Sequence, residues 1–484
     1  MTAPTQQKRS GLWDLPVFRT FAPPTEWVDT DTETGTPSEI APWSLPGATL
    51  RTNVGAARRG RYAPALKGAP TTTKQAQILN TAVVGSPTGT KGVVLGRDVL
   101  SRTTLAHDPV TAYNSVPREV SSPNVIVMGD VGRGKSSFTK TNFVLRPLLL
   151  AGRRAVVFDK KDESGEGEYS EVVRHFGYEP IKFTTDGTGS RLNLLDPLIS
   201  RGSGVEGQAR LVETVTRVAR NDVPLNDWEK EAVRAALRLT NGAQRGRNAV
   251  LADVLPNLGS VVDDAEYSTL SARAKDDLHL AGLSVRWTLN GLLDEYAGLL
   301  DGETSKEVDL QGKLTSFDIS QLPDDGPAVP VVMAIGNMWM LGRLRGERDS
   351  ATNVVWEEGW HMIGGPTAHL VKSYTKLSRG LGISNIFVMH KGTDIPAGSP
   401  GMAIIQEAQT VVIYGLGRPE DARWAQETFG LAPETSATIE NLGSGFFVFK
   451  YGSNPETMAQ HIRSPWEVSM TNTDTGLAAG NRAG

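Results

Sequence analysis

The chain has 484 residues, of which 39% are hydrophobic and 21% charged, so it can bury a large core in about two or three domains. It contains no cysteine, which excludes disulfide bonds and thiolate metal sites and fits a reducing compartment such as the cytoplasm. A formal net charge of -4 at pH 7 excludes a strongly basic overall composition, although it is compatible with a local basic channel for nucleic acid.

Residues 1–72 are rich in Pro, Thr, Gly and Ala and show no sustained hydrophobic period, which predicts a disordered arm. Aromatic side chains in this arm are unusual for a simple linker. They fit either a segment that becomes ordered on a partner or a loosely packed tail, and the main ones are Trp13, Phe18, Phe21, Trp27 and Trp43.

No stretch of the sequence has the pattern of a membrane span or a signal peptide. The most apolar run, Val329–Leu341, is shorter than the about 20 residues that a helix needs to cross a bilayer. The first residues also lack an apolar signal core. We therefore expect a cytoplasmic protein without a transmembrane segment, able to dock at the inner face of the cell membrane.

After the arm, two short strands are expected at Thr81–Val84 and Gly92–Gly96, where a nucleotide-type domain would begin. Further along, the apolar run Asn124–Met128 predicts a buried strand, and Ser137–Leu150 predicts a helix that Pro147 interrupts late. The eight residues between them read Gly-Asp-Val-Gly-Arg-Gly-Lys-Ser and fit the phosphate-binding pattern Gly-x-x-x-x-Gly-Lys-Ser/Thr.

Each part of this loop has a physical role in binding a polyphosphate. Glycines let consecutive backbone N–H groups turn toward phosphate oxygens, and the following helix directs its positive dipole end at the anion. Lys135 is expected to reach the β- and γ-phosphates, and the Ser136 hydroxyl to bind Mg²⁺. The predicted nucleotide-binding residues are Gly129, Asp130, Val131, Gly132, Arg133, Gly134, Lys135, Ser136 and Ser137.

Later apolar runs predict the other strands of a central sheet. Arg154–Phe158 follows the first helix, and strand, helix and strand together imply a right-handed parallel crossover. Near-continuous apolar runs are typical of parallel strands that are covered on both faces. They recur at Val354–Trp356, Asn385–Met389 and Val411–Tyr414, with a late edge hairpin strand at Gly445–Phe449.

Between these strands the apolar residues change to helical spacing, as at Leu211, Val215 and Val218, and Asp227 is expected to cap a helix over Trp228–Thr240. The sequence therefore predicts an α/β fold, with a mainly parallel sheet and an all-helical insertion. The expected parts are 73–203 and 306–470 for the two halves of the nucleotide domain, 204–305 for the insertion and 471–484 for a disordered tail.

Hydrolysis needs acids beside the phosphate loop as well as the loop itself. The strand Val354–Trp356 runs directly into Glu357 and Glu358. An isolated Glu-Glu pair is usually a solvated turn, but a pair at a strand end downstream of a phosphate loop favours a functional interpretation. We expect Glu357 to hold Mg²⁺ through water and Glu358 to act as the general base on the attacking water.

Two further residues are candidates with strong structural alternatives. Arg379 lies just before the strand Asn385–Met389 and can stabilise the γ-phosphate of a neighbouring subunit, or it is an ordinary turn arginine. His390 ends that strand, where strand C-termini surround a nucleotide, and can sense the γ-phosphate, or it is a structural histidine. His361 and His369 have no metal-like neighbours in the sequence, so no metal other than Mg²⁺ is expected.

Several blocks together resemble the conjugative, type IV secretion traffic ATPases of the HerA/FtsK group of RecA-like motors, particularly actinobacterial members. The resemblance covers roughly residues 80–470. The phosphate loop is specific for nucleotide, whereas the order and spacing of the other blocks indicate this family. The blocks are Pro123–Val125, Val156–Asp159 followed by Gly167–Tyr169, Arg191–Pro197, Thr315–Ser320, Glu357–Trp360 and Ser464–Glu467.

The resemblance implies a RecA-like ATPase with ATP and Mg²⁺ bound at the junctions of a ring oligomer, either a hexamer or a ring-forming dimer. It implies a role in energising conjugative DNA transfer or assembly of a membrane transfer channel. It also implies Lys135 and Ser136 on phosphate and metal, Glu357 on metal, Glu358 on water and Arg379 across the junction. The chain departs from the family at Glu357, where Asp is usual, and at Met389–His390, where many members carry Thr-Gln.

Three other functions are compatible with these residues to different degrees. A coupling-type translocase would pump DNA itself, but such proteins usually carry N-terminal membrane helices. An ATP-gated scaffold would bind nucleotide and oligomerise with little turnover, and Glu357 in place of Asp keeps that alternative open. A small GTPase-like switch is disfavoured, because no Asn-Lys-x-Asp guanine-reading segment is present and the helical insertion is large.

Overall fold

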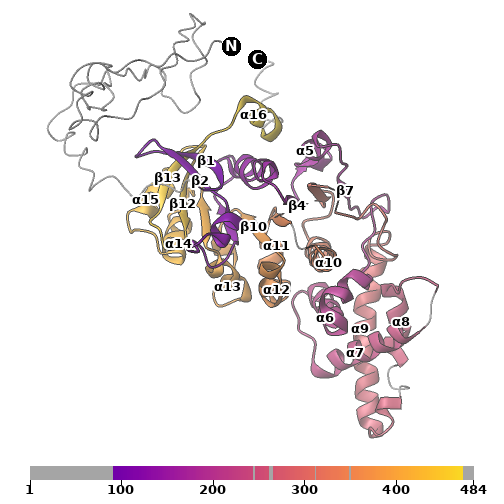
Figure 1. The fold of residues 1–484 in the computed structure, drawn as a ribbon. Coiled ribbons are helices and arrows are strands. Elements are labelled where there is room, and N and C mark those ends of the chain that lie inside the picture. Colours follow the sequence, from indigo (N-terminus) through magenta and orange to yellow (C-terminus); the bar gives the residue numbers. More distant parts are fainter. Residues whose placement is uncertain (1–90, 244–245, 261–264, 311, 348–349, 473–484) are drawn as a thin grey trace, which may run out of the picture. The chain divides into compact units, whose positions relative to one another are not determined.

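A computed structural model describes residues 91–472, apart from 244–245, 261–264, 311 and 348–349 (Figure 1). The expected arm at 1–72, the strand at Thr81–Val84 and all but the first two residues of the expected tail lie outside these residues. We refer to the residues that the structure covers as the described part.

In the described part, eleven strands form one sheet in the order β2-β1-β13-β12-β11-β3-β10-β9-β4-β8-β7. The seven strands from β11 to β7 pair in parallel, and the other four add antiparallel pairs at one side. The bounds are Val93–Asp98 (β1), Thr104–His107 (β2), Val125–Met128 (β3), Arg153–Asp159 (β4), Ile181–Lys182 (β7), Leu314–Asp318 (β8), Ala351–Trp356 (β9), Ile383–Met389 (β10), Thr410–Ile413 (β11), Phe446–Tyr451 (β12) and Thr457–His461 (β13).

The late strand predicted at Gly445–Phe449 exists as β12, but its predicted place at the edge is wrong. β12 lies between β11 and β13, and β13 in turn pairs with β1. The sheet therefore continues past the hairpin into strands from the beginning of the described part. Only two of the five residues of β13, Met458 and Ala459, are apolar, so its sequence did not predict a strand that would pair with β12.

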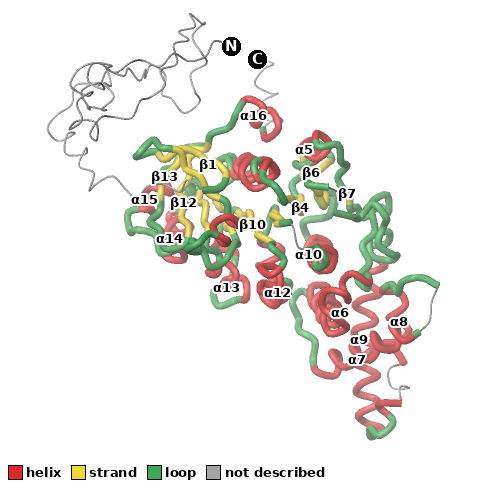
Figure 2. Tube along the Cα trace, in the orientation of Figure 1, coloured by secondary structure: helices red, strands yellow, loops and turns green. Residues whose placement is uncertain are grey.

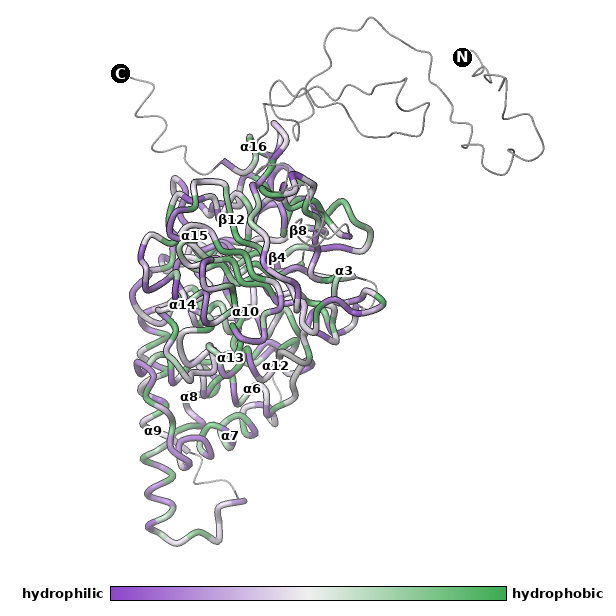
Figure 3. The backbone as a smooth tube through the Cα atoms, turned by 90° about the vertical axis from the view of Figure 1, so that its left-hand side faces the viewer, coloured by the Kyte–Doolittle hydropathy of each residue, from purple (hydrophilic) through white to green (hydrophobic). Residues whose placement is uncertain are grey.

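The parallel strands are buried on both faces, and their side chains alternate between two cores. In β3, Val125 and Val127 belong to one hydrophobic cluster, whereas Ile126 and Met128 belong to the other. Figure 3 shows hydrophobic residues concentrated along the strands in the middle of the described part. This two-sided burial explains why the strands read as near-continuous apolar runs.

Helices cover both faces of the sheet (Figure 2). The cluster that contains Val125 also contains side chains of α4, its π-helical continuation and α5, and the other cluster includes residues of α10, α12, α13 and α14. These and the remaining short helices are Pro109–Asn114 (α3), Lys135–Thr139 (α4), the π-helix Lys140–Leu145, the 3-10 turn Pro147–Leu149, Ser170–His175 (α5), Ala328–Leu344 (α10), Trp360–Ile363 (α11), Ala368–Gly380 (α12), the 3-10 turn Gly392–Asp394, Pro400–Glu407 (α13), Pro419–Phe429 (α14), Thr435–Glu440 (α15) and Pro465–Thr471 (α16).

A helical cluster interrupts the α/β order between β7 and β8, as predicted. It consists of Pro197–Ala219 (α6), Asp227–Gly242 (α7), Leu251–Ser260 (α8) and Ala272–Glu295 (α9), with a short 3-10 turn at Ala265–Tyr267. Helix α6 contacts α10 of the sheet layer (Figure 1). Gly204, the expected start of the insertion, lies inside α6 at a non-helical kink.

The expected cap at Asp227 is wrong by one residue. Asn226 caps α7, because its side chain accepts from the backbone N–H of Glu229 at 2.9 Å and the Glu229 carboxylate accepts from the Asn226 N–H at 2.9 Å. This reciprocal pair is a capping box, and Asp227 then occupies the first helical position.

Among the described helices, none has both the length and the hydropathy to cross a bilayer. The apolar run predicted at Val329–Leu341 forms most of α10, which has 17 residues and is almost entirely buried against the sheet and α6.

Candidate functional site

A pocket of about 260 Å³ lies at the carboxyl ends of β3, β9 and β10, where the predicted loop, acids and histidine follow their strands. In the sheet β10 separates β3 from β9, so the ends of three neighbouring parallel strands meet at this edge. This is the edge at which open α/β sheets bind ligands.

The phosphate loop leaves β3 through glycines that take backbone angles unfavourable for other residues. Gly129, Gly132 and Gly134 have φ of 148°, 74° and 107°. A Cβ on Gly129 would lie 2.5 Å from the Cβ of Tyr414, which is too close for any side chain. The loop is also held from outside, because the Gly129 N–H donates to the carbonyl of His390 at 3.2 Å.

Lys135 begins helix α4 and turns its ammonium back across the loop. Its Nζ donates to the carbonyl oxygen of Asp130 at 2.8 Å and to His390 Nδ1 at 3.3 Å. An ammonium can only donate, so Nδ1 of His390 accepts and Nε2 carries the proton. Nε2 then donates to Glu358 Oε1 at 3.1 Å, so His390 connects the loop lysine to the predicted base.

Burial lowers the pKa of Lys135 to about 8, although the nearby carboxylates of Glu357 and Glu358 oppose this shift. A bound polyphosphate would add negative charge beside the ammonium and restore its preference for the proton.

Glu358 is an ionised carboxylate that is held from two sides. Besides the bond from His390, the Trp360 indole N–H donates to Oε2 at 2.9 Å. Burial alone would raise the pKa of Glu358, but the bonds from His390 and Trp360 and the charge of Lys135 outweigh burial and lower it. Its φ of 51° is a strained left-handed angle, of the kind that concentrates at functional sites.

Glu357 has the opposite electrostatic setting. Its side chain is buried, and the Tyr169 hydroxyl donates to Oε1 at 2.5 Å. Burial, and after it the charge of Glu168, raises the pKa of Glu357 to about 7. The environments of the two adjacent acids thus shift their pKa values in opposite directions. This pattern is typical of sites where two carboxylates have different chemical roles.

A stability test follows from the raised pKa of Glu357. Between its usual value near 4.5 and about 7 the folded protein binds this proton and the unfolded chain does not, so the contribution to stability is complete below pH 4.5 and is lost as pH rises through 7. Glu357→Gln keeps an acceptor for Tyr169 without the charge. We expect it to raise the free energy of unfolding by roughly 1–3 kcal/mol at pH 8.5 and to change it little at pH 4.5.

Denaturant unfolding at both pH values, without nucleotide or metal, measures this difference against the wild type. Glu179→Gln is the control, because the Glu179 side chain is 77% exposed. An equal effect of Glu357→Gln at both pH values would contradict the raised pKa.

The structure brings most of the predicted residues together. Those that line the pocket are Val131, Gly132, Gly134, Lys135, Ser136, Ser137, Glu357, Glu358 and His390. Gly129, Asp130 and Arg133 shape the loop from outside the pocket wall: Asp130 Oδ2 accepts from the Gly417 N–H at 2.6 Å, and Arg133 donates to the carbonyl of Leu442 at 3.1 Å.

Arg379 is not in this pocket. It lies in the last turn of α12, just before β10 begins at Ile383, whereas the pocket lies past the other end of β10 at Met389. Seven strand residues span roughly 20 Å, so Arg379 cannot reach this pocket of its own chain.

Seven pocket residues were not predicted as site residues, namely Lys161, Val388, Met389, Ser444, Arg463, Thr471 and Asn472. Lys161 Nζ lies 3.4 Å from Ser136 Oγ, and Arg463 donates to Thr471 Oγ1 at 2.9 Å. Lys161 lies two residues after the block Val156–Asp159, and Arg463 directly precedes the block Ser464–Glu467. Basic residues next to such blocks were the signal that could have found them.

These residues fit a magnesium-bound nucleotide. Mg²⁺ usually keeps several waters and uses one or two protein ligands with substrate phosphates. A direct Ser136 hydroxyl and a Glu357 carboxylate that holds a metal-bound water fit this pattern, and both residues line the pocket. No group of three or more His, Asp or Glu in the described part forms a metal cluster of another kind.

No family model and no curated protein matches this chain. Among solved structures, VirB4 of Thermoanaerobacter pseudethanolicus aligns over 79% of this chain and 100% of its own, with a TM-score of 0.62 and 17% identity. The plasmid coupling protein TrwB aligns over 82% of this chain and 96% of its own at 14% identity, with TM-scores of 0.52 for its complex with ADP and Mg²⁺ and 0.50 for its complex with ADPNP.

The fold is therefore similar to those of VirB4 and TrwB, which confirms the predicted α/β fold with a mainly parallel sheet and a helical insertion.

Proposed function

We propose that this protein is an ATP-hydrolysing motor that energises conjugative transfer or assembly of a type IV secretion channel. The observation that carries the proposal is the contact chain Lys135–His390–Glu358, which places a phosphate-loop ammonium and an ionised carboxylate on one pocket. The similarity to VirB4 and to TrwB in complex with ADP and Mg²⁺ supports the assignment to this kind of machine.

In this proposal the loop glycines, Lys135 and Ser137 bind ATP, and Ser136 and Glu357 hold Mg²⁺, which would shield phosphate charge. Glu358 accepts a proton from the attacking water. Its lowered pKa keeps it ionised at neutral pH, and the bonds from His390 and Trp360 fix the orientation of both its oxygens.

We further propose a ring oligomer, most simply a hexamer, with ATP at the subunit junctions. Arg379 would then act on the pocket of a neighbouring subunit, which fits its position at the sheet edge away from its own pocket. The ring would work in the cytoplasm at the inner face of the membrane, against components of a transfer channel. The actinobacterial character of the family rests on the sequence blocks alone.

A coupling-type DNA translocase is the second candidate, favoured by the similarity to the plasmid coupling protein TrwB. An ATP-gated scaffold is the third, because Glu357 is longer than the usual Asp and its raised pKa weakens its charge at neutral pH. The three candidates differ in what they do with ATP and DNA.

The test is phosphate release by the purified protein with Mg²⁺·ATP, alone and with single- or double-stranded DNA, together with sizing with and without nucleotide. Turnover without DNA and assembly into rings are the results expected for the channel motor. Hydrolysis that appears only with DNA would favour the translocase. ATP binding without any phosphate release would favour the ATP-gated scaffold.

A further inference from the structure

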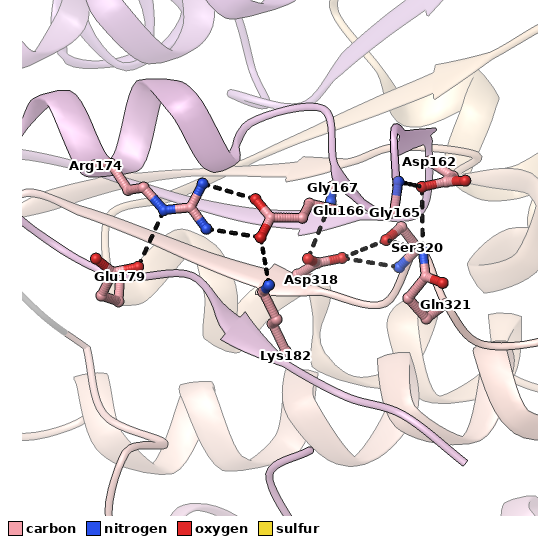
Figure 4. A network of polar contacts seen from close by, with 10 residues as sticks. All are labelled: Asp162, Gly165, Glu166, Gly167, Arg174, Glu179, Lys182, Asp318, Ser320 and Gln321. Atoms are coloured by element: carbon pink, nitrogen blue, oxygen red, sulfur yellow. Dashed lines mark hydrogen bonds and ion pairs between the residues drawn. The ribbon is translucent and has the colours of Figure 1, made fainter. Parts of the chain in front are cut away.

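A short hairpin between β4 and α5 is fixed to the sheet edge beside the nucleotide pocket. Its strands are Asp162–Glu163 (β5) and Glu166–Gly167 (β6). Glu166 accepts two bonds from Arg174, at 2.7 and 2.9 Å, and one from Lys182 at 2.5 Å. Figure 4 shows these contacts of Glu166. It also shows Asp318, whose carboxylate accepts from the Gly167 N–H at 3.0 Å.

The residue just before this hairpin, Lys161, extends into the pocket. Its Nζ lies 3.4 Å from Ser136 Oγ and 3.3 Å from Glu168 Oε2. The Lys161 side chain is 45% exposed, whereas that of Glu168 is 1% exposed. The Lys161 ammonium therefore contacts the buried Glu168 carboxylate. It also faces the space beside the Ser136 hydroxyl, which we assign to Mg²⁺.

Glu168 has a second cation, so Lys161 is free to move without leaving a buried carboxylate unpaired. Lys140 Nζ lies 3.3 Å from Glu168 Oε1, and its side chain is only 2% exposed.

The other pocket lysine is less free to follow a ligand. Lys135 is bonded to the Asp130 carbonyl and to His390. Of the described charged residues of the pocket wall, Lys135, Lys161 and Arg463 are basic and Glu357 and Glu358 are acidic, so Lys161 contributes to a positive surplus. A metal-bound triphosphate remains an anion and needs a positive surplus.

We propose that Lys161 is a second phosphate-binding ammonium, which leaves Glu168 to contact the terminal phosphate of a bound triphosphate and so distinguishes ATP from ADP. This role rests on the proposed function, because it assumes that the pocket binds a nucleotide. Lys161 belongs neither to the phosphate-loop pattern nor to the strand-end acids. Its role would add a residue that determines specificity for the triphosphate.

The test is calorimetric titration with Mg²⁺ and either ADP or the non-hydrolysable analogue ADPNP. Lys161→Met is expected to weaken ADPNP binding roughly tenfold or more, since it removes a charge-assisted contact, and to leave ADP binding nearly unchanged. Lys161→Arg, which keeps the charge, is expected to retain most of the preference for ADPNP. Lys182→Met is the matched control, because it removes a lysine from the same hairpin network outside the pocket.

An unchanged ratio of the two affinities in Lys161→Met would overturn the proposal. An equal loss in Lys182→Met would also overturn it, because the hairpin would then act only as a structural support. Melting temperatures without nucleotide show whether each variant is folded. If the wild type binds neither ADPNP nor ADP, the proposed function itself fails, whereas normal wild-type binding with an unaffected Lys161→Met rejects only this inference.

Discussion

Glu358→Gln is expected to lower the rate of ATP hydrolysis by at least about 100-fold while ATP still binds, because the amide cannot accept the proton of the attacking water. The substitution is nearly isosteric. The Gln oxygen can still accept from either His390 Nε2 or the Trp360 indole, so the contact chain to Lys135 is largely kept.

Steady-state phosphate release gives kcat, and calorimetric titration with ADPNP gives the affinity. Glu179→Gln serves as the control, because Glu179 is an exposed carboxylate that pairs with Arg174, and neither residue lines the pocket. Equal and measurable hydrolysis in the wild type and in Glu358→Gln would show that another group activates water. If neither protein hydrolyses ATP that both bind, the scaffold alternative gains and the motor is rejected.

The pH profile of hydrolysis gives a second view of the same residue. The lowered pKa of Glu358 means that loss of the base should appear only at acidic pH. A change in rate near neutral pH would instead point to Glu357, whose pKa is about 7 in the absence of ligand.

The parts of the site that are contiguous in sequence were predictable. The phosphate loop depends on a strand, eight residues and a helix in order, and the structure has Val125–Met128, then the loop, then α4. The acids after β9 and the histidine after β10 could also be placed, since carboxyl ends of parallel strands share one sheet edge.

What depends on tertiary folding could not be predicted in the same way. Lys161 reaches the pocket only because the following hairpin is fixed by Glu166 and Asp318, and none of these contacts is visible in local periodicity. β12 became an inner strand because β13 pairs with its second edge, and β1, which is distant in the sequence, then extends the sheet beyond β13. The helix expected over Ser137–Leu150 is α-helical only to Thr139, and it continues as a π-helix and a 3-10 turn before the chain enters β4.

The helix change also matters for the site. The π-helical segment begins at Lys140, whose side chain turns inward and donates to the Glu168 carbonyl oxygen at 2.7 Å. Helical bulges of this kind often accompany functional sites. Here the π-helix carries the buried cation that compensates Glu168, one contact away from Lys161.

Lys135→Met is expected to weaken Mg²⁺·ADPNP binding by roughly 10- to 100-fold, because it removes a charge-assisted contact to the phosphates. Unlike Lys161, this residue is expected to affect ADP as well, since it reaches the β-phosphate through the loop. The loss has a second cause in this structure. The Asp130 carbonyl and His390 Nδ1 would both lose their donor, so the loop and the histidine that orients Glu358 would be less well held.

Titrations with ADPNP and ADP measure both affinities, and Lys91→Met is the control because Lys91 is an exposed surface lysine paired with Glu119. Removing a partly desolvated ammonium should not unfold the protein, because burial already lowers the pKa of Lys135 to about 8 and its charge is costly without a ligand. The melting temperature of Lys135→Met without nucleotide should therefore stay close to that of the wild type, because relief of this cost offsets the two lost hydrogen bonds. Unchanged affinity for both nucleotides would mean that the loop does not bind phosphate, and the proposed motor would have no nucleotide site at this edge of the sheet.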